Sequence, residues 1–318
     1  MEVYCILLHS EFLYVDRPQG SSKLREGFTK MQLAIRSLAR PPVTVGRRQD
    51  GLVFPSQTRN CWKRILAAPA VRGVFCMDEA LGVDLPSEKW IHLEEFGHKG
   101  VDLETGVCGP PSAGWDRLFH RVQEFLREHR GKMVVLSLGE LEPRKGFDLL
   151  LQLVATNPDT VCLRIGRTKP RYRSTWAAVH AKEQLILENR LLELDLYVRD
   201  ERLIQQAYSG ISFMILPYRK FYRTSGIFVE SLWHGKPVLA ADNGVMARRI
   251  RTHSVGQTFE DDSFESLQAT FPEFVGRLAE FRPHIDKYRR LLGWETLEAK
   301  LSLLVTPHGH NDGHSREN

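Results

Sequence analysis

Two short segments of the sequence carry residue types that suit phosphate binding. The first, GELEPRKG (139–146), places Arg144 and Lys145 immediately before a predicted helix. Because the N-terminus of a helix carries partial positive charge, each cation there is disfavoured by about 0.3–1 kcal/mol. A bound anion would remove this conflict, since backbone amides at a helix N-terminus and cationic side chains both bind phosphate. The alternative is a solvated loop in which Asp148 offsets the charge.

The second segment, RTSGIFVESLWHG (223–235), holds another helix start followed by a single carboxylate. Thr224 or Ser225 can cap this helix, and Gly226 lets a ligand approach the backbone closely. Glu230 lies one turn, about 5–6 Å, beyond Gly226 on the same face. Amides beside a carboxylate suit a nucleoside diphosphate, whose phosphates adjoin the two ribose hydroxyls. The alternative is an ordinary acid near a helix start.

Alternating strand and helix patterns position both segments. The predicted strands cover residues 133–138, 160–166, 192–198, 212–217 and 236–242. Amphipathic helices are predicted between them, at 147–155, 175–188, 201–209 and within the second segment, after an earlier one at 115–129. Five such units predict a doubly wound parallel sheet, which binds ligands beyond the carboxyl ends of its strands. After residue 263 the pattern is helical to about residue 304.

The N-terminal part also predicts an α/β arrangement. Strands are expected at 3–9, 41–46, 71–77 and 89–96, with helices at 22–39 and 61–68. The Gly- and Pro-rich stretch 98–114 is the predicted linker. The expected organisation is therefore two Rossmann-like domains at 1–112 and 113–290, a C-terminal helix at 291–306 and a disordered tail at 307–318.

Three segments resemble a known family. LGELEPRKGFDLLLQL, LYVRDERLIQQAYSGISFMILPYR and SGIFVESLWHGKPVLAADNG are similar, in order and spacing, to the nucleotide-binding half of retaining glycosyltransferases of family 4 (group 1). The resemblance spans residues 132–259, about two fifths of the chain. It implies a GT-B fold whose two domains face a cleft. It also implies transfer of a hexose from a UDP or GDP sugar to a hydroxyl acceptor with retention of configuration, and no metal or other cofactor.

The resemblance assigns roles to individual residues. Lys145, with Arg144, matches the donor diphosphate site and acts in catalysis, and Glu230 matches the glutamate that binds ribose. The Ser225 and Gly226 amides would hold the phosphates, and the backbone at Val198 and Arg199 would contact the base. A catalytic histidine beside the donor sugar is best matched by His9, at the end of the first predicted strand, and next by His98. A structural histidine is the alternative in both cases.

Two positions depart from the family pattern. Tyr222 replaces the first of two glutamates, so Tyr222 and Arg223 would lie near the donor sugar, and Glu140 replaces a basic residue in the first segment. Arg144, Arg219 or Arg223 could supply the missing charge. Some family members share PYR…SG, so activity is still expected. A catalytically silent sugar-nucleotide-binding or scaffold protein stays open, whereas an epimerase would need a second catalytic carboxylate, for which the sequence offers no clear candidate.

The composition limits the kinds of binding partner to be expected. The net charge of +5 and a pI near 8.9 favour phosphate-bearing ligands or an anionic membrane surface. The basic helix 22–39 could rest on the inner membrane face, or it could simply be solvated. The basic stretch RTKPRYR (167–173) lacks any accompanying nucleic-acid motif, so no nucleic-acid partner is expected. A glycan or lipid-linked acceptor and a role in polysaccharide biosynthesis follow from the resemblance.

Cellular location and domain size are further expectations. The longest apolar runs are far below the roughly 18 residues of a membrane span. The five scattered cysteines show no C-x-x-C spacing, so they predict free thiols rather than a metal site. A cytoplasmic protein is therefore expected. The N-terminal domain would be short for the family, either because the chain begins late or because the domain is abbreviated.

Overall fold

The computed structural model describes residues 3–7, 46–48, 51–53, 63–64, 66–67, 71–76, 88, 90–92, 113–169, 172, 176–198, 201–221, 225–292 and 296. Several predicted features lie outside these residues. They are the helix 22–39, most of the linker 98–114, the C-terminal tail, and His9, His98, Arg199, Tyr222 and Arg223.

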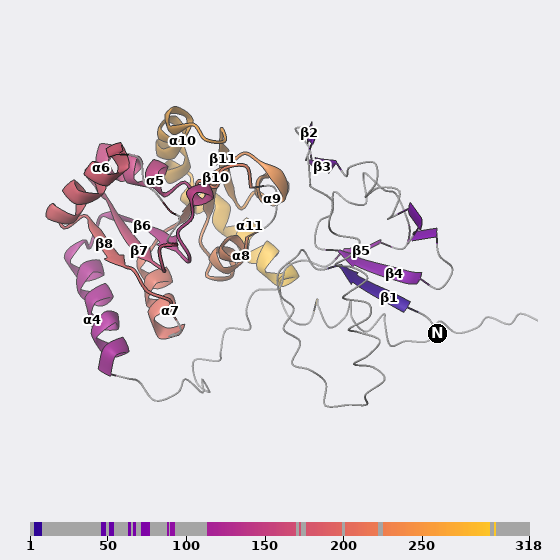
Figure 1. Ribbon diagram of the computed structural model, residues 1–318, viewed down its shortest axis with the longest axis horizontal. Coiled ribbons are helices and arrows are strands. Elements are labelled where there is room, and N and C mark those ends of the chain that lie inside the picture. Colours follow the sequence, from indigo (N-terminus) through magenta and orange to yellow (C-terminus); the bar gives the residue numbers. More distant parts are fainter. Residues whose placement is uncertain are drawn as a thin grey trace, which may run out of the picture.

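The C-terminal domain contains two parallel three-stranded sheets (Figure 1). The first has the order β6-β7-β8 and the second the order β11-β10-β9. Their bounds are β6 Met133–Leu138, β7 Thr160–Ile165, β8 Leu191–Leu194, β9 Met214–Leu216, β10 Val238–Ala241 and β11 Gly256–Phe259. Strand β6 lies beside β9, so the spatial order is β8-β7-β6-β9-β10-β11. The chain reverses its direction of progress between β6 and β9, which is the topological switch point where doubly wound folds bind ligands.

Helices cover this arrangement on both sides. Helices α4 (Ala113–Glu128) and α7 (Glu201–Gly210) pack together on one side, and α5 (Phe147–Thr156) and α6 (Trp176–Leu187) on the other, as Figure 1 shows. Helix α10 (Phe264–Gly276) packs on α5, and α11 (Leu278–Leu291) on α8 (Gly226–Trp233) and α9 (Gly244–His253). All six residues of β7 are buried, as expected for a parallel strand with both faces covered.

The predicted units of this domain are confirmed, with one addition. The structure adds α9 and the edge strand β11 between the strand predicted at 236–242 and the helical region, where the sequence analysis predicted no element. Strand β11 is GQTF, and Phe259 is its one buried residue, so the alternation that marks a strand is absent. The helical region after residue 263 is divided into α10 and α11, which meet at Arg277.

The N-terminal part contains a parallel sheet of order β1-β4-β5, which confirms its predicted α/β class. These strands are β1 Val3–Leu7, β4 Val71–Cys76 and β5 Trp90–His92. A separate antiparallel pair, β2 (Gly46–Arg48) and β3 (Gly51–Val53), was not predicted. Of the strand predicted at 41–46, only Gly46 is described. The domain boundaries themselves stay predictions.

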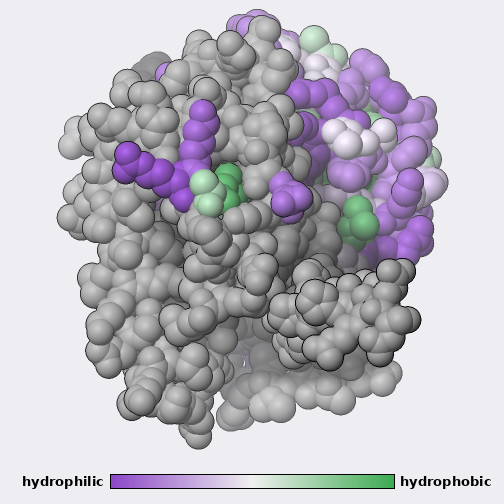
Figure 2. Space-filling view, turned by 90° about the vertical axis from the view of Figure 1, so that its right-hand side faces the viewer, coloured by the Kyte–Doolittle hydropathy of each residue, from purple (hydrophilic) through white to green (hydrophobic). Residues whose placement is uncertain are grey.

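The described surface offers little apolar area on the side seen in Figure 2. There the described residues are mainly hydrophilic, with hydrophobic residues in small separate spots. Among the described helices, none has the length and apolar character needed to cross a bilayer.

Gly146 controls how α5 meets the sheet. It follows the short 3-10 turn η1 (Pro143–Lys145) and has a φ of 62°, in the left-handed region that favours glycine. A Cβ at this position would lie 2.0 Å from the carbonyl oxygen of Pro217, just beyond β9. The start of α5 therefore packs directly on the backbone that follows β9.

We expect Gly146→Ala to lower the free energy of unfolding by about 2–5 kcal/mol, because backbone strain adds to a steric clash. Gly235→Ala is the matched control: its φ is 70°, but a Cβ there would meet nothing within 4 Å. The control should lose only about 1–2 kcal/mol. Denaturant unfolding measures both, and equal losses would show that the contact with Pro217 is unimportant.

Candidate functional site

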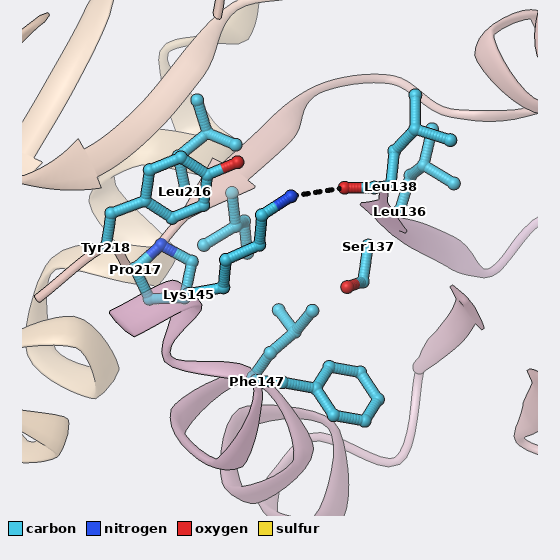
Figure 3. Close-up of a pocket in the computed structure, with 10 residues that line it drawn as sticks. Leu136, Ser137, Leu138, Lys145, Phe147, Leu216, Pro217 and Tyr218 are labelled. Atoms are coloured by element: carbon cyan, nitrogen blue, oxygen red, sulfur yellow. Dashed lines mark hydrogen bonds between the residues drawn. The ribbon is translucent and has the colours of Figure 1, made fainter. Parts of the chain in front are cut away.

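Lys145 lies at the switch point between β6 and β9. Its side chain runs from η1 toward the carboxyl end of β6, where Nζ donates a hydrogen bond to the carbonyl oxygen of Leu138 at 3.0 Å (Figure 3). On the other side, Nζ lies 5.7 Å from the ring centroid of Tyr218, which follows β9. The lysine thus spans the two strands at the point where the open-sheet rule places a ligand.

Burial lowers the pKa of Lys145 to about 8. The positive charge of the neighbouring Arg144 contributes to this lowered pKa, whereas Glu142 and Glu140 act in the opposite direction. Among the described residues, no carboxylate forms a direct ion pair with Lys145. The hollow between β6 and β9 has a volume of about 10 Å³, enough for one water-sized group. A partly desolvated cation held without a direct counter-ion favours an anionic ligand.

Tyr218 connects this lysine to the start of α8. Its ring lies beside Lys145, and its hydroxyl is within hydrogen-bonding reach of the Ser225 side chain. Asn243 Nδ2 donates to the Tyr218 carbonyl oxygen at 3.0 Å, and Phe221 packs edge-on against the ring at 5.3 Å between centroids. Burial raises the pKa of Tyr218 to about 12, so its hydroxyl stays protonated. The two segments singled out from the sequence therefore meet at one tyrosine.

The N-terminus of α8 is uncrowded by the described part of the chain. Ser225 is the N-cap residue, but its side chain makes no capping hydrogen bond, and the first helical bond runs from the Val229 amide to the Ser225 carbonyl oxygen at 3.1 Å. Gly226 is exposed, and a Cβ there would meet nothing within 4 Å. Glu230 is half-buried one turn further on. The helix ends at Trp233, and Gly235 follows with a φ of 70°.

Glu140 and Glu142 tie together the loops that follow β6 and β7. The Leu141 amide donates to the Arg167 carbonyl oxygen at 2.8 Å, which extends the parallel pairing of the two strands. Glu140 accepts from Arg167 Nη2 at 2.9 Å and lies 3.2 Å from Lys169 Nζ. Hydrogen bonds from these two cations lower the pKa of Glu140. The position that is basic in the resembled family therefore holds a loop in place.

The other loop cations are paired in the same way. Glu142 bonds Arg144 Nε at 2.9 Å and forms an ion pair with Lys169. The Arg144 guanidinium also lies over the ring of Phe221, 4.9 Å from its centroid.

Arg219 fastens the loop after β9 to the first turn of α5. It binds Asp148 through two hydrogen bonds of 2.6 and 2.7 Å, and it forms an ion pair with Asp262. Its amide donates to the Arg144 carbonyl oxygen at 2.7 Å. Asp148 therefore pairs with Arg219 and not with Arg144 or Lys145, contrary to the alternative interpretation of the first segment. Nothing in the sequence pattern indicated this pair, since its members lie 71 residues apart, one on the loop after β9 and the other on α5.

The remaining sequence-derived site residues are not brought together by the described part of the chain. Val198 is half-buried just after β8 and packs against the core. His9, Arg199, Tyr222 and Arg223 lie outside the described residues. Sequence reasoning missed Tyr218, although its place directly after β9, between Lys145 and Ser225, was a usable signal.

Comparisons with known proteins support the fold. No protein-family model matches the sequence, and no curated protein matches it. Among solved structures, sucrose-phosphate synthase from Thermosynechococcus elongatus has 18% identity and a TM-score of 0.53, over 79% of this chain and 61% of that one. HepE from Anabaena, solved with UDP, has 16% identity and a TM-score of 0.55, over 74% and 64%. WaaG, a glycosyltransferase involved in lipopolysaccharide biosynthesis, has 14% identity and a TM-score of 0.53, over 91% and 85%.

These likenesses establish the fold class predicted from the sequence. The chain has Rossmann-like parallel sheets flanked by helices, in the GT-B arrangement of these glycosyltransferases. It spans less than two thirds of the length of the synthase and of HepE.

The lowered pKa of Lys145 has a measurable consequence for stability. Because the pKa of Lys145 is about 8 in the folded protein and the ordinary pKa of lysine is 10.5, the unfolded chain binds more protons between these two pH values. Stability from this group therefore rises with pH across that interval. We expect the free energy of unfolding of the wild type to rise by about 2–3 kcal/mol relative to Lys145→Met from pH 7 to pH 10.

Denaturant titrations of both proteins at matched pH values test this, since the other titrating groups are shared. At pH 7 the methionine variant should be at least as stable as the wild type. If the free energies of unfolding of the two proteins differ by the same amount at every pH from 7 to 10, the desolvation of Lys145 is contradicted.

Proposed function

We propose that this protein is a retaining glycosyltransferase that moves a hexose from a nucleoside diphosphate sugar to a hydroxyl acceptor. The observation that supports this most is the contact of Tyr218 with both Lys145 and Ser225. It brings the N-terminus of α8 and a cation with no direct carboxylate partner among the described residues to the switch point of a GT-B domain. Each of these features binds phosphate, and together they suit a diphosphate.

In this proposal the site stabilises the leaving group. Negative charge grows on the diphosphate as the bond to the sugar breaks. Lys145, the Ser225 and Gly226 amides, and Arg144 at the rim would stabilise that charge as groups already in place. Glu230 would accept hydrogen bonds from the two ribose hydroxyls and thereby position the sugar.

The roles proposed for the other residues follow the family resemblance. The backbone at Val198 and Arg199 would contact the base, and Tyr222 and Arg223 would border the donor sugar. His9 would act beside the sugar from the N-terminal domain.

The donor proposed first is a UDP sugar, with a GDP sugar as the second choice. HepE, which is 15–16% identical to this chain, has been solved with UDP, with UDP and glucose, and with UDP-glucose. The proposed acceptor is a glycan or a lipid-linked sugar, with peripheral contact at the inner membrane face and a role in polysaccharide biosynthesis. This would place the protein in the cytoplasm.

We also propose that the reaction needs no metal ion. Within the described ranges, no group of three or more His, Cys, Asp or Glu side chains is arranged to hold one. The proposal rests instead on Lys145 and the helix amides, which supply positive charge where a metal ion would otherwise do so.

The proposal is tested by measuring the release of UDP or GDP from a panel of UDP-hexoses and GDP-hexoses with EDTA present. We expect Lys145→Met to lower kcat/KM by about 10²–10³, the usual effect of removing one preorganised donor. Lys236→Met is the matched control. Lys236 is also half-buried and donates to a backbone carbonyl, that of Ile211, at 2.7 Å, but it lies before β10, at the opposite end of the strands.

The control variant should retain wild-type turnover. Equal losses in both variants would remove Lys145 from the site. Thermal stabilisation by UDP or GDP without any turnover would instead support the catalytically silent protein. Turnover that requires a divalent ion would contradict the proposed metal independence.

A further inference from the structure

Two consecutive cations of the GELEPRKG segment each lie against one ring of an aromatic pair that follows β9. The Arg144 guanidinium lies over the ring of Phe221, 4.9 Å from its centroid. Lys145 Nζ lies 5.7 Å from the centroid of the Tyr218 ring (Figure 3). The two rings meet edge to face, with 5.3 Å between their centroids and an interplanar angle of 90°. The two positive charges are thus held on two rings that pack against each other.

The chain that presents Phe221 is fixed by contacts of the two residues before it. The Arg219 side chain binds Asp148 through two hydrogen bonds, and the Lys220 amide donates to Asp261 Oδ2 at 3.1 Å. Lys220 has a φ of 47°, which is unfavourable for a residue with a side chain and persists only where surrounding contacts hold it. The protein therefore spends backbone strain to place Phe221 where it lies.

Arg144 is held in a way that keeps donors available for a ligand. Its carbonyl oxygen accepts from the Arg219 amide at 2.7 Å, and its Nε donates to Glu142 Oε2 at 2.9 Å. Glu142 also pairs with Lys169, so its charge is shared between two cations. Within the described ranges neither terminal nitrogen of the Arg144 guanidinium has a hydrogen-bond partner, and the side chain is 43% exposed.

An aromatic ring suits this purpose better than a second carboxylate would. The π face attracts a guanidinium that lies over it, whereas the N–H groups of the guanidinium stay in its own plane. A carboxylate would bind those N–H groups and so compete with a phosphate for them. The contact with Phe221 therefore orders the cation and leaves its terminal N–H groups to a ligand.

We propose that Phe221 is a positioning residue that holds Arg144 at the rim of the diphosphate site. Its ring keeps the guanidinium in one orientation, in which both terminal nitrogens can donate to phosphate oxygens. The inference rests on the proposed function, in which Arg144 helps to bind the diphosphate. Without the ring, the arginine side chain would have to be ordered when the nucleotide binds, which weakens binding.

Calorimetric titrations with UDP and with GDP test this role, and the variants are compared on the nucleotide that binds the wild type more tightly. We expect Phe221→Leu to weaken binding about 3- to 5-fold, because it keeps an apolar side chain but removes the π face. Phe221→Tyr keeps the ring and should bind as the wild type does. Arg144→Met should weaken binding about 10-fold, and Phe221→Leu should cause no further loss in that background.

Phe281→Leu is the matched control. Phe281, on α11, also lies under an arginine, since the Arg277 guanidinium is 5.5 Å from its ring centroid. It packs on Phe274, which in turn packs on Phe213, before β9 and at the opposite end of that strand from the site. This variant should keep the wild-type affinity for the nucleotide, although Phe281 is more deeply buried than Phe221.

The outcomes separate this inference from the proposed function. A wild type that binds neither UDP nor GDP would overturn both. Full affinity in Phe221→Leu, or a further loss when it is added to Arg144→Met, would overturn the positioning role alone. Equal losses in Phe221→Leu and Phe221→Tyr, or in Phe221→Leu and Phe281→Leu, would do the same, because they mark a purely structural residue. The predicted pattern in a protein without turnover would support the role of Phe221 and contradict the transferase.

Discussion

The placement of one half-buried cation, Lys145, between β6 and β9 is the constraint on which the rest of the site depends. Its ammonium group donates to the Leu138 carbonyl oxygen, and the next residue, Gly146, lets the chain turn against the backbone of Pro217. The same close packing puts Tyr218 beside the lysine and, through Tyr218, brings the start of α8 to the same point. A positive charge kept out of water in this way is unfavourable for the free protein, as is common where a site must bind an anion.

The charges around this lysine are arranged to hold loops. Glu140 pairs with Arg167 and Lys169, which joins the loops after β6 and β7. Arg219 pairs with Asp148 and Asp262, which joins the loop after β9 to α5 and to the turn after β11. Because these cations already have partners, Lys145 is left to face a ligand. The described parts of these loops are thus held together by ion pairs before a ligand binds, which is the kind of preorganisation that favours catalysis.

The sequence predicted the succession of strands and helices in the C-terminal domain and the two phosphate-suited segments, because each depends on local pattern: apolar strands, helix starts and glycines. It missed β11, which has a single buried residue and so lacks the alternation of buried and exposed side chains that marks a strand. It also missed α9, which precedes β11. It also missed the Arg219–Asp148 pair and the junction at Tyr218, because contacts between segments far apart in the sequence are set by tertiary packing. In the sequence, Glu140 replaces a residue that is often basic in the resembled family. The structure places its carboxylate between two cations of the neighbouring loop.

A crystal structure of the protein with UDP bound tests the central claim most directly. The account predicts the diphosphate at the switch point, with Lys145 Nζ released from Leu138 and hydrogen-bonded to a phosphate oxygen. It also predicts the Ser225 and Gly226 amides on the diphosphate and Glu230 on the ribose. A diphosphate bound elsewhere, with Lys145 still on the Leu138 carbonyl oxygen, would contradict it.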